Sequence, residues 1–501
     1  MDKLRDSFEA PPPPIPAKDI KETVATDVVV VGAGIAGLTA ALSAAEAGAK
    51  VTLLEKGPTY SVRGLHNAAF ASRLQKQAGL KTDRDQVINT IMEFGAYRSD
   101  QRLVKLWADN CDGVMDWLLD MAEAAGIEVV LDTTTKPWYF PNYPLIHVFM
   151  PKYQETLAEM LQSNARAKGV DFRFQTPAVR LLREGKGRVT GVIARNSNGD
   201  YAQFNARRAV VLCTGDYGND RRMVEKYCWP VLGELKCAYV PEHEPSLNTG
   251  DGHKMGMWVG AAIDEPPHCA MLFDWAVWSQ KGLFNLARQP WQYVNLDGER
   301  FMNEDLPWGY ECAQILQQPG RVAWSVWDAK YNQEIPEMRS QCCKNMGPPT
   351  YLWNPIQLDE ALEKGNVLTA ATIEELAREI NAPAETFKAS VARYNELARQ
   401  GKDMDFGKHP DRLTTIEEPP FYACQMETRY MVILSGLKVN TNLQVLDTER
   451  HVIPGLYAAG NVSGGFFGNQ YPTTVPGATH SRAWTFGRLA GLNAAALTKP
   501  D

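Results

Sequence analysis

The chain has 501 residues, 45% of them hydrophobic, and a formal net charge of −7 at pH 7. A chain of this length exceeds what one hydrophobic core usually supports, so we expect two or more domains. The acidic balance argues against a nucleic-acid partner. No run of about 18 apolar residues occurs, which predicts that no segment spans a membrane.

Residues 1–21 are charged and then proline-rich (Pro11–Pro14), which predicts a flexible or surface-hugging arm before the first domain. This segment lacks the apolar core of a secretory signal, so we expect a cytoplasmic protein. Export after removal of a signal is the alternative.

Residues 27–56 predict a complete βαβ unit. Val28–Val31 is typical of a buried parallel strand, a helix is expected from about Ile35 to Ala47, and Val51–Leu54 predicts the next strand. The first turn reads Gly32-Ala33-Gly34-Ile35-Ala36-Gly37. This G-x-G-x-x-G spacing between a strand and a helix predicts a dinucleotide site.

Each glycine of this motif has an expected role. Gly32 makes the tight turn, Gly34 lets the backbone approach a pyrophosphate, and Gly37 lets the helix and strand pack closely. The helix N-terminus offers unpaired N–H groups to the phosphates. Glu55, at the end of the second strand, is expected to accept hydrogen bonds from a ribose.

Further elements follow along the chain. Helices are expected at about 88–126 and 153–167, and short strands at 171–174, 178–183, 189–195 and 209–214, with a hairpin turn at 196–199. The composition changes between about 264 and 432, where a capping box at 372–375 and a helix at 384–400 predict an inserted domain. Strand patterns return from about 436, and Pro476-Gly477 opens a terminal helix to about Leu497.

Nine cysteines are present without a C-x-x-C spacing or a ferredoxin-like pattern. We therefore predict no metal centre, iron–sulfur cluster or attached haem.

Two features favour FAD over NAD: the motif lies near the N-terminus, and the chain closes with a strand–glycine–helix unit, 456–478. Here the sequence resembles the FAD-binding subunits of fumarate reductase and succinate dehydrogenase, with the related 3-ketosteroid dehydrogenases and urocanate-type reductases. The matching segments, in order, are Val31–Gly37, Leu212–Gly215, Asn248–Met255, Gly298–Glu304, Ile453–Asn461 and Thr485–Gly491.

The resemblance implies an α/β fold: a Rossmann-like FAD-binding domain of the GR2 type, with a parallel sheet plus a β-meander, and an inserted α+β capping domain. The FAD-binding domain would comprise residues 22–263 and 433–501, and the capping domain residues 264–432. The active site would lie between the two.

The resemblance also implies which residues contact FAD. They are Gly32, Ala33, Gly34, Ile35, Ala36, Gly37, Glu55, Lys56, Arg63, Gly64, Val179, Thr214, Gly215, Asp251, Gly460, Asn461, Gly477, Ala478 and Thr479. Family members usually carry glutamate at the position of Asn461. The histidine to which some members attach FAD aligns one place from His66, so we expect non-covalent FAD.

The arginines that clamp a dicarboxylate in fumarate reductases are missing. None occurs at 306–310 or 468–477, and 431–433 is apolar where a histidine is expected. A buried dicarboxylate would remain unpaired at a cost of several kcal/mol. Fumarate and succinate are therefore not the expected substrates.

Aromatic residues take these positions. Pro307-Trp308 resembles the Pro-Tyr of ketosteroid dehydrogenases, and Tyr471 before Pro476–Thr479 resembles their Tyr…Pro-Gly-Ala-Thr. The resemblance makes Trp308 and Tyr471 candidate catalytic residues and implies a flat polycyclic or phenolic substrate. Tyr310 or Tyr471 is the expected proton donor, with His268 as the alternative.

The resemblance therefore implies hydride transfer between flavin N5 and a carbon of such a substrate, with reduction more expected than dehydrogenation. Electrons would come from outside the chain, from NAD(P)H, reduced flavin or a separate donor protein. Two alternatives stay open: a reductase of a small unsaturated acid held by Arg288 or Arg339, and a non-enzymatic electron-transfer subunit.

Overall fold

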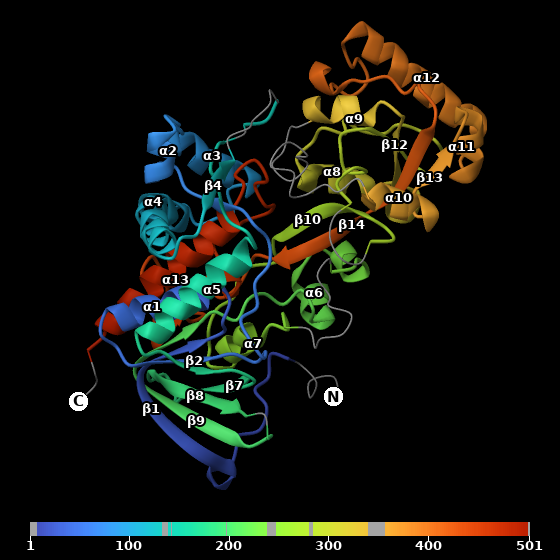
Figure 1. The fold of residues 1–501 in the computed structure, drawn as a ribbon. Helices are drawn as coiled ribbons and strands as arrows, with labels where there is room; N and C mark the ends of the chain where they lie inside the picture. The colour runs from blue at the N-terminus through green and yellow to red at the C-terminus, as the bar shows by residue number, and fades with distance from the viewer. Residues whose placement is uncertain are drawn as a thin grey trace.

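A computed structural model describes residues 8–132, 139–141, 143–196, 198–237, 247–279, 284–338 and 356–498. It forms two lobes (Figure 1). The larger holds the first and last of the described residues, and the smaller, which we call the cap lobe, consists of the described residues between 270 and 433.

An eight-stranded sheet is the base of the larger lobe. Its main path runs β15-β16-β9-β1-β2-β6, and β7 and β8 form an antiparallel meander beside β9. The pairs β16–β9, β9–β1, β1–β2 and β2–β6 are parallel. The strands are β1 (Ile20–Val31), β2 (Val51–Leu54), β6 (Asp171–Arg173), β7 (Ala178–Arg183), β8 (Val189–Arg195), β9 (Tyr201–Leu212), β15 (Gln444–Leu446) and β16 (Val452–Ala458). The predicted parallel sheet with a meander is confirmed.

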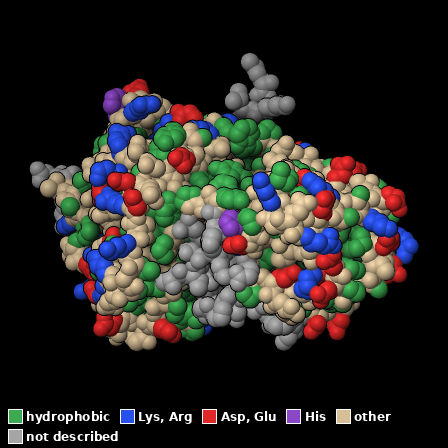
Figure 2. All heavy atoms as spheres, turned by 90° about the horizontal axis from the view of Figure 1, so that it is seen from above, with side chains coloured by type: hydrophobic (Ala, Val, Ile, Leu, Met, Phe, Trp, Pro, Cys, Tyr) green, Lys and Arg blue, Asp and Glu red, His purple; other side chains and the backbone are tan. Residues whose placement is uncertain are grey.

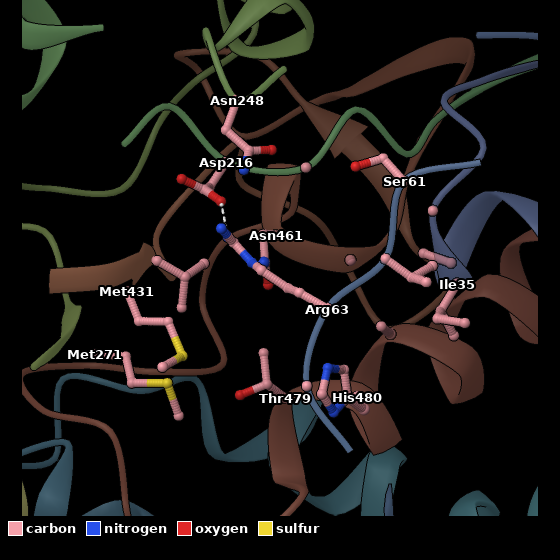
Figure 3. A pocket seen from close by; sticks show the side chains of 18 of the residues that line it. Ile35, Ser61, Arg63, Asp216, Asn248, Met271, Met431, Asn461, Thr479 and His480 are labelled. Carbon is pink, nitrogen blue, oxygen red and sulfur yellow. Dashed lines mark hydrogen bonds and ion pairs between the residues drawn. The ribbon is translucent and has the colours of Figure 1, made fainter. Parts of the chain in front are cut away.

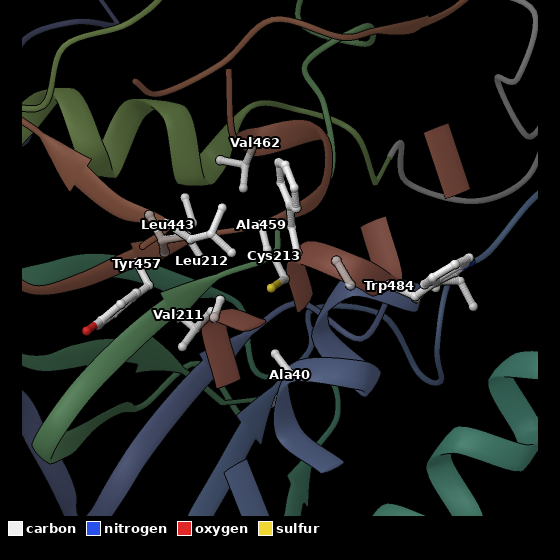
Figure 4. Packing of buried hydrophobic residues seen from close by; sticks show 14 of the residues in the cluster. Ala40, Val211, Leu212, Cys213, Leu443, Tyr457, Ala459, Val462 and Trp484 are labelled. Carbon is white, nitrogen blue, oxygen red and sulfur yellow. The ribbon is translucent and has the colours of Figure 1, made fainter. Parts of the chain in front are cut away.

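Two helices, α1 (Ile35–Glu46) and α13 (Ala478–Ala496), pack against each other on this sheet. Their backbones meet through glycine: a Cβ at Gly487 would lie 2.4 Å from the Ala36 carbonyl oxygen, and one at Gly491 2.2 Å from that of Ala40. Any side chain there would force the helices apart. Figure 4 shows Ala40 of α1 near Val211 and Leu212 of β9, with Trp484 of α13 in the same core but set apart from these residues.

A small antiparallel sheet and four more helices complete this side of the larger lobe. Helix α5 packs against α1, and α4 packs against α13. The elements are β3 (Asn67–Ala68), β4 (Val129–Asp132), β5 (Ile146–Phe149), α2 (Arg73–Gln77), α3 (Arg84–Phe94), α4 (Gln101–Ala124) and α5 (Gln154–Ala167). The prediction of a single helix at 88–126 is wrong. Helix α3 ends at Phe94, and the next turn contains Ala96 and Tyr97, which both have positive φ angles. The Asp100 side chain then caps the start of α4.

The cap lobe is built on an antiparallel sheet in the order β10-β14-β12-β11, with β13 beside β14. Strands β10 and β14 connect it to the larger lobe (Figure 1). Its elements are β10 (Ala270–Ala276), β11 (Gln292–Val294), β12 (Val322–Trp327), β13 (Leu368–Ala370), β14 (Phe421–Ile433), α8 (Trp308–Ile315), α9 (Tyr331–Glu334), α10 (Ile356–Glu363), α11 (Ile373–Glu379) and α12 (Ala384–Gln400). Helix α12 has the predicted bounds.

The capping box expected at 372–375 forms only in part. The Thr372 hydroxyl accepts from the Glu375 N–H, but the Glu375 carboxylate accepts from the N–H of Ala371, one residue before the cap. The start of α11 is still where the sequence predicts it.

The N-terminal residues that the structure describes lie along helices α6 (Arg221–Tyr227) and α7 (Asp251–Trp258). The Trp258 indole donates to the Phe8 carbonyl oxygen, 2.9 Å away. Strand β1 already begins at Ile20, before the expected domain start at 22. The proposed boundaries at 264 and 432 stay predictions.

On the face seen in Figure 2, acidic and basic side chains are interspersed rather than gathered by sign. Every helix in the described ranges is too short or too polar to cross a bilayer.

Candidate functional site

The glycine turn between β1 and α1 has the geometry its spacing predicts. Gly32 has φ +105°, and a Cβ there would lie 2.4 Å from the Cys213 carbonyl oxygen. A Cβ at Gly37 would lie 1.8 Å from the Gly32 carbonyl oxygen. At Gly34 a Cβ would contact only the Ser61 carbonyl oxygen, at 3.5 Å. Gly32 and Gly37 therefore serve the fold, and Gly34 leaves space for a ligand.

Glu55 is fixed at the end of β2. Its Oε2 accepts from the Ala33 N–H and its Oε1 from the Gly57 N–H, each at 2.7 Å. Each carboxylate oxygen keeps a lone pair for another donor. Glu55 lines a cavity of about 90 Å³ with Lys56, Thr214 and Asp251.

A larger cavity of about 680 Å³ adjoins this one. Both are lined by Gly34, Ser61, Cys213, Gly215, Leu247 and Asn248. The larger cavity extends to the start of α13 and to the base of the cap lobe. Together the two cavities form one elongated site that begins at the glycine turn.

The wall on the side of the larger lobe offers unused polar groups. The hydroxyls of Thr214 and Thr479 are buried and have no hydrogen-bond partner among the described residues. Helix α13 begins behind Gly477, and its first internal bond is the Ser481 N–H to the Gly477 carbonyl oxygen. The N–H groups before Ser481 have no partner within the helix, so this end attracts negative charge.

Two ion pairs border the site. Lys56 Nζ lies 2.9 Å from Asp251 Oδ2, and Arg63 Nη2 lies 2.7 Å from Asp216 Oδ2. In Figure 3 the Arg63 side chain reaches across the larger cavity to Asp216. Burial raises the pKa of Asp216 above its ordinary value, and the nearby Arg63 guanidinium offsets this rise only in part. Among the described residues that line this cavity, Arg63 is the only lysine or arginine.

The opposite wall consists of large apolar side chains from the cap lobe and its base. These are Met271, Phe273, Trp308 and Met431. Met271 and Met431 come from the paired strands β10 and β14 and lie together at one side of the cavity (Figure 3). The Phe273 and Trp308 rings have centroids 4.2 Å apart. Tyr471, from the loop before α13, completes this end.

Comparison with known proteins shows the family to which the chain belongs. The FAD binding domain family matches residues 27–473. The chain belongs to this family. It is an FAD-dependent oxidoreductase of the fumarate reductase type, whose members act on carbon–carbon bonds.

Several relatives cover nearly the whole chain. It is 30% identical to a vinyl phenol reductase of Lactiplantibacillus plantarum, over 94% of this chain and 97% of that protein. It is 28% identical to a urocanate reductase of Eggerthella lenta, over 95% and 75%. Among solved structures, the open conformation of a flavocytochrome c3 fumarate reductase has 25% identity and a TM-score of 0.73, over 96% and 79% of the chains.

The residues present fit FAD. The open space at Gly34 and the N-terminus of α1 suit a phosphate-containing ligand. The Thr214 and Thr479 hydroxyls, which have no partner among the described residues, and the N-terminus of α13 suit a ligand that bears carbonyl groups. Of the expected FAD residues, those that line the two cavities are Gly32, Gly34, Ile35, Ala36, Glu55, Lys56, Arg63, Gly64, Thr214, Gly215, Asp251, Gly460, Asn461, Gly477 and Thr479.

Four expected FAD residues lie just outside the lining. Ala33 donates its N–H to Glu55, Gly37 packs under the turn, and Ala478 is the buried first residue of α13. Val179 follows Ala178, which does line the smaller cavity.

The four expected catalytic residues divide into two pairs. Trp308 and Tyr471 line the large cavity, and Tyr310 and His268 do not. The Tyr310 ring stacks on Phe94 of the larger lobe, with centroids 5.2 Å apart. His268 Nε2 donates to the Asp264 carbonyl oxygen and Nδ1 accepts from the Tyr217 hydroxyl. Burial lowers the pKa of His268 to about 4.

Sequence reasoning missed several lining residues, among them Met271, Phe273 and His480. His480 follows the Pro-Gly-Ala-Thr segment directly, so its position at the start of α13 was available as a signal. Met271 and Phe273 occupy alternate positions of one strand, a spacing that marks one face of a sheet but not what that face meets.

Proposed function

We propose that this flavoprotein reduces a carbon–carbon double bond conjugated to a phenolic or polycyclic ring system with little charge. The observation that carries the proposal is the composition of the cavity wall on the cap side. Two methionines, a phenylalanine and a tryptophan face the cavity there, without a lysine or arginine. Such a wall suits a flat apolar ring.

The electrostatics of the cavity support the same substrate class. Its one arginine, Arg63, already pairs with Asp216, so a substrate carboxylate would have to displace a buried carboxylate. An anion left without a cationic partner in a buried site is costly. A neutral phenol or enone avoids that cost. The likeness to a vinyl phenol reductase over nearly the full length of both chains adds support.

In this proposal FAD, when bound, supplies hydride chemistry at its N5 position. Tyr471 would supply the proton, since its phenol lines the same cavity as the aromatic residues of the cap. Trp308 and Phe273 would hold the substrate ring and exclude water. The reducing equivalents would come from NAD(P)H, reduced flavin or a donor protein.

A reductase of a small unsaturated acid is the second candidate, and the surroundings of Arg288 weigh against it. Arg288 is fully buried, pairs with Asp274 at 2.9 Å and lies behind the Trp308 ring. It would have to leave that pair to bind a substrate. Arg339 lies outside the described residues. A purely electron-transferring subunit is the third candidate, but it would not need the large apolar side chains of the cap lobe to line the cavity.

The test is anaerobic reduction of the flavoprotein followed by reoxidation with a panel of acceptors. We expect 4-vinylphenol, an isoflavone or a steroid enone to reoxidise the flavin at least a hundredfold faster than fumarate or urocanate. Equal or faster reoxidation by fumarate or urocanate would reject the proposal. A chain that no acceptor in the panel reoxidises would favour the electron-transfer subunit.

A further inference from the structure

A second arginine, Arg482, lies directly behind the cavity wall. It belongs to the first turns of α13 and is fully buried. Its Nη2 donates to Asn461 Oδ1 at 2.8 Å and its Nη1 to the Ser463 carbonyl oxygen at 3.2 Å. Asn461 itself lines the large cavity. One hydrogen bond therefore separates the guanidinium from the site.

The partners of Arg482 are all neutral. Among the described residues no carboxylate forms an ion pair with it, and its Nε has no hydrogen-bond partner. The guanidinium lies over the Phe467 ring, 5.1 Å from the centroid, and Phe467 packs against Tyr471. Burial lowers the pKa of Arg482 to about 10, so it remains protonated at neutral pH.

Such an arrangement is costly for stability. A buried charge is normally paired with an opposite charge, because neutral dipoles replace its hydration only in part. The Asp264 carboxylate raises the pKa of Arg482 through space, without an ion pair among the described residues. The rest of the positive charge is left to act on whatever occupies the cavity.

We propose that Arg482 is a positioning residue that raises the reduction potential of the bound flavin. Reduction places negative charge on the N1–C2 carbonyl edge of the ring system. The wall around Asn461 and the start of α13 is where we assign that ring. A fixed cation in a medium of low dielectric constant, acting together with the N-terminus of α13, stabilises the reduced flavin. This proposal rests on FAD binding and not on the proposed substrate.

The experiment compares midpoint potentials of the purified holoprotein, measured by equilibration with reference dyes. In Arg482→Met we expect the ratio of reduced to oxidised flavin at a fixed potential to fall at least tenfold. For a two-electron couple this corresponds to about 30 mV. Arg482→Lys, which keeps the charge, should remain within threefold of the wild type. Arg488→Met is the matched control, because Arg488 is on the same helix but pairs with Glu46.

Arg482→Gln guards against loss of the fold, since its amide can still donate to Asn461. In this variant too we expect the ratio of reduced to oxidised flavin to fall at least tenfold. If the ratio of reduced to oxidised flavin at the fixed potential stays within threefold of the wild-type ratio in either neutral variant, the proposal is overturned. An equal fall in Arg482→Lys would also overturn it. Loss of FAD from both neutral variants but not from Arg482→Lys would assign Arg482 to the fold instead.

Discussion

The two walls of the cavity are built in different ways. The wall from the larger lobe consists mostly of backbone, glycines and helix N-termini, contributed by short segments of consecutive residues. The wall from the cap lobe consists of large side chains that come from β10, α8 and β14, and β14 lies more than a hundred residues beyond the other two in the chain. The wall proposed to hold FAD is thus built from local motifs, and the wall proposed to meet the substrate from side chains assembled over long range.

The supports behind the walls also differ. Behind the cap-lobe wall the Arg288–Asp274 pair is fully buried and the guanidinium lies 4.8 Å from the Trp308 ring centroid. Removing one member of such a pair costs about 3–5 kcal/mol of stability, so the support behind Trp308 is sensitive to substitution. The wall of the larger lobe relies on close backbone contacts at Gly32, Gly37 and Gly477.

The largest expected effect is at the glycine wall. Gly34→Val should abolish FAD binding, because its side chain would fill the space for the pyrophosphate while meeting little protein. Gly113→Val is the control, since a Cβ at this exposed helix position meets nothing within 4 Å. Absorbance at 450 nm per chain measures both. A Gly34→Val protein that folds and carries one FAD would place the phosphates elsewhere.

The next effect concerns proton supply at the junction of the two walls. Tyr471→Phe should keep the flavin spectrum and lose about a hundredfold or more in turnover of the best acceptor, the usual range for a general acid. Tyr310→Phe should stay close to the wild type, because its ring stacks on Phe94 outside the lining. Reversed results would move the proton source to α8. A dead His268→Ala beside two active tyrosine variants would assign it to His268.

A smaller effect is expected from the cap wall alone. Trp308→Leu should raise KM for an aromatic acceptor about tenfold with FAD retained, since aromatic contacts contribute about 0.5–1.5 kcal/mol beyond their buried area. Leucine still covers Arg288, which limits the damage to the fold. Trp324→Leu, a cap-lobe change outside the lining, is the control for steady-state kinetics. An unchanged KM would argue that the substrate ring binds away from Trp308.

The smallest expected effect is on the pH dependence of the unfolding free energy, which should differ between the two lobes. Burial raises the pKa of Glu334 in the cap lobe to about 7, so its neutral form is favoured in the folded state. The stabilisation is present below about pH 4.5 and is lost as pH rises through 7. Relative to the wild type, Glu334→Gln should gain about 1–2 kcal/mol in unfolding free energy between pH 5 and 8.

The larger lobe should respond in the opposite direction. Burial lowers the pKa of His147 to about 4, so this group costs stability as pH falls below 6.5. Denaturant titrations at a series of pH values measure the Glu334→Gln difference. A difference that does not change with pH would show that Glu334 is not held in its neutral form.

Much of the FAD site follows from the sequence because its motifs are local. The order strand, glycine turn, helix fixes where N–H groups and open space must occur, whatever surrounds them. Thus Gly34, Glu55 and Gly477 lie where their spacing predicts. The close contact of Gly487 and Gly491 with α1 explains the last matching segment, although the sequence alone did not indicate its partner.

The substrate wall was decided by tertiary structure. Trp308 and Tyr310 are two residues apart on α8, so their side chains point about 200° apart around the helix. Only packing decides that Trp308 faces the cavity and Tyr310 faces Phe94. In the same way β10 presents Met271 and Phe273 to the site because β14 pairs beside it. The sequence by itself determined the dinucleotide site, because that depends on residues adjacent in the chain, and the order of six motifs along the chain implied FAD and the reaction class. The cavity that meets the substrate depends on contacts between distant segments, which no local pattern encodes.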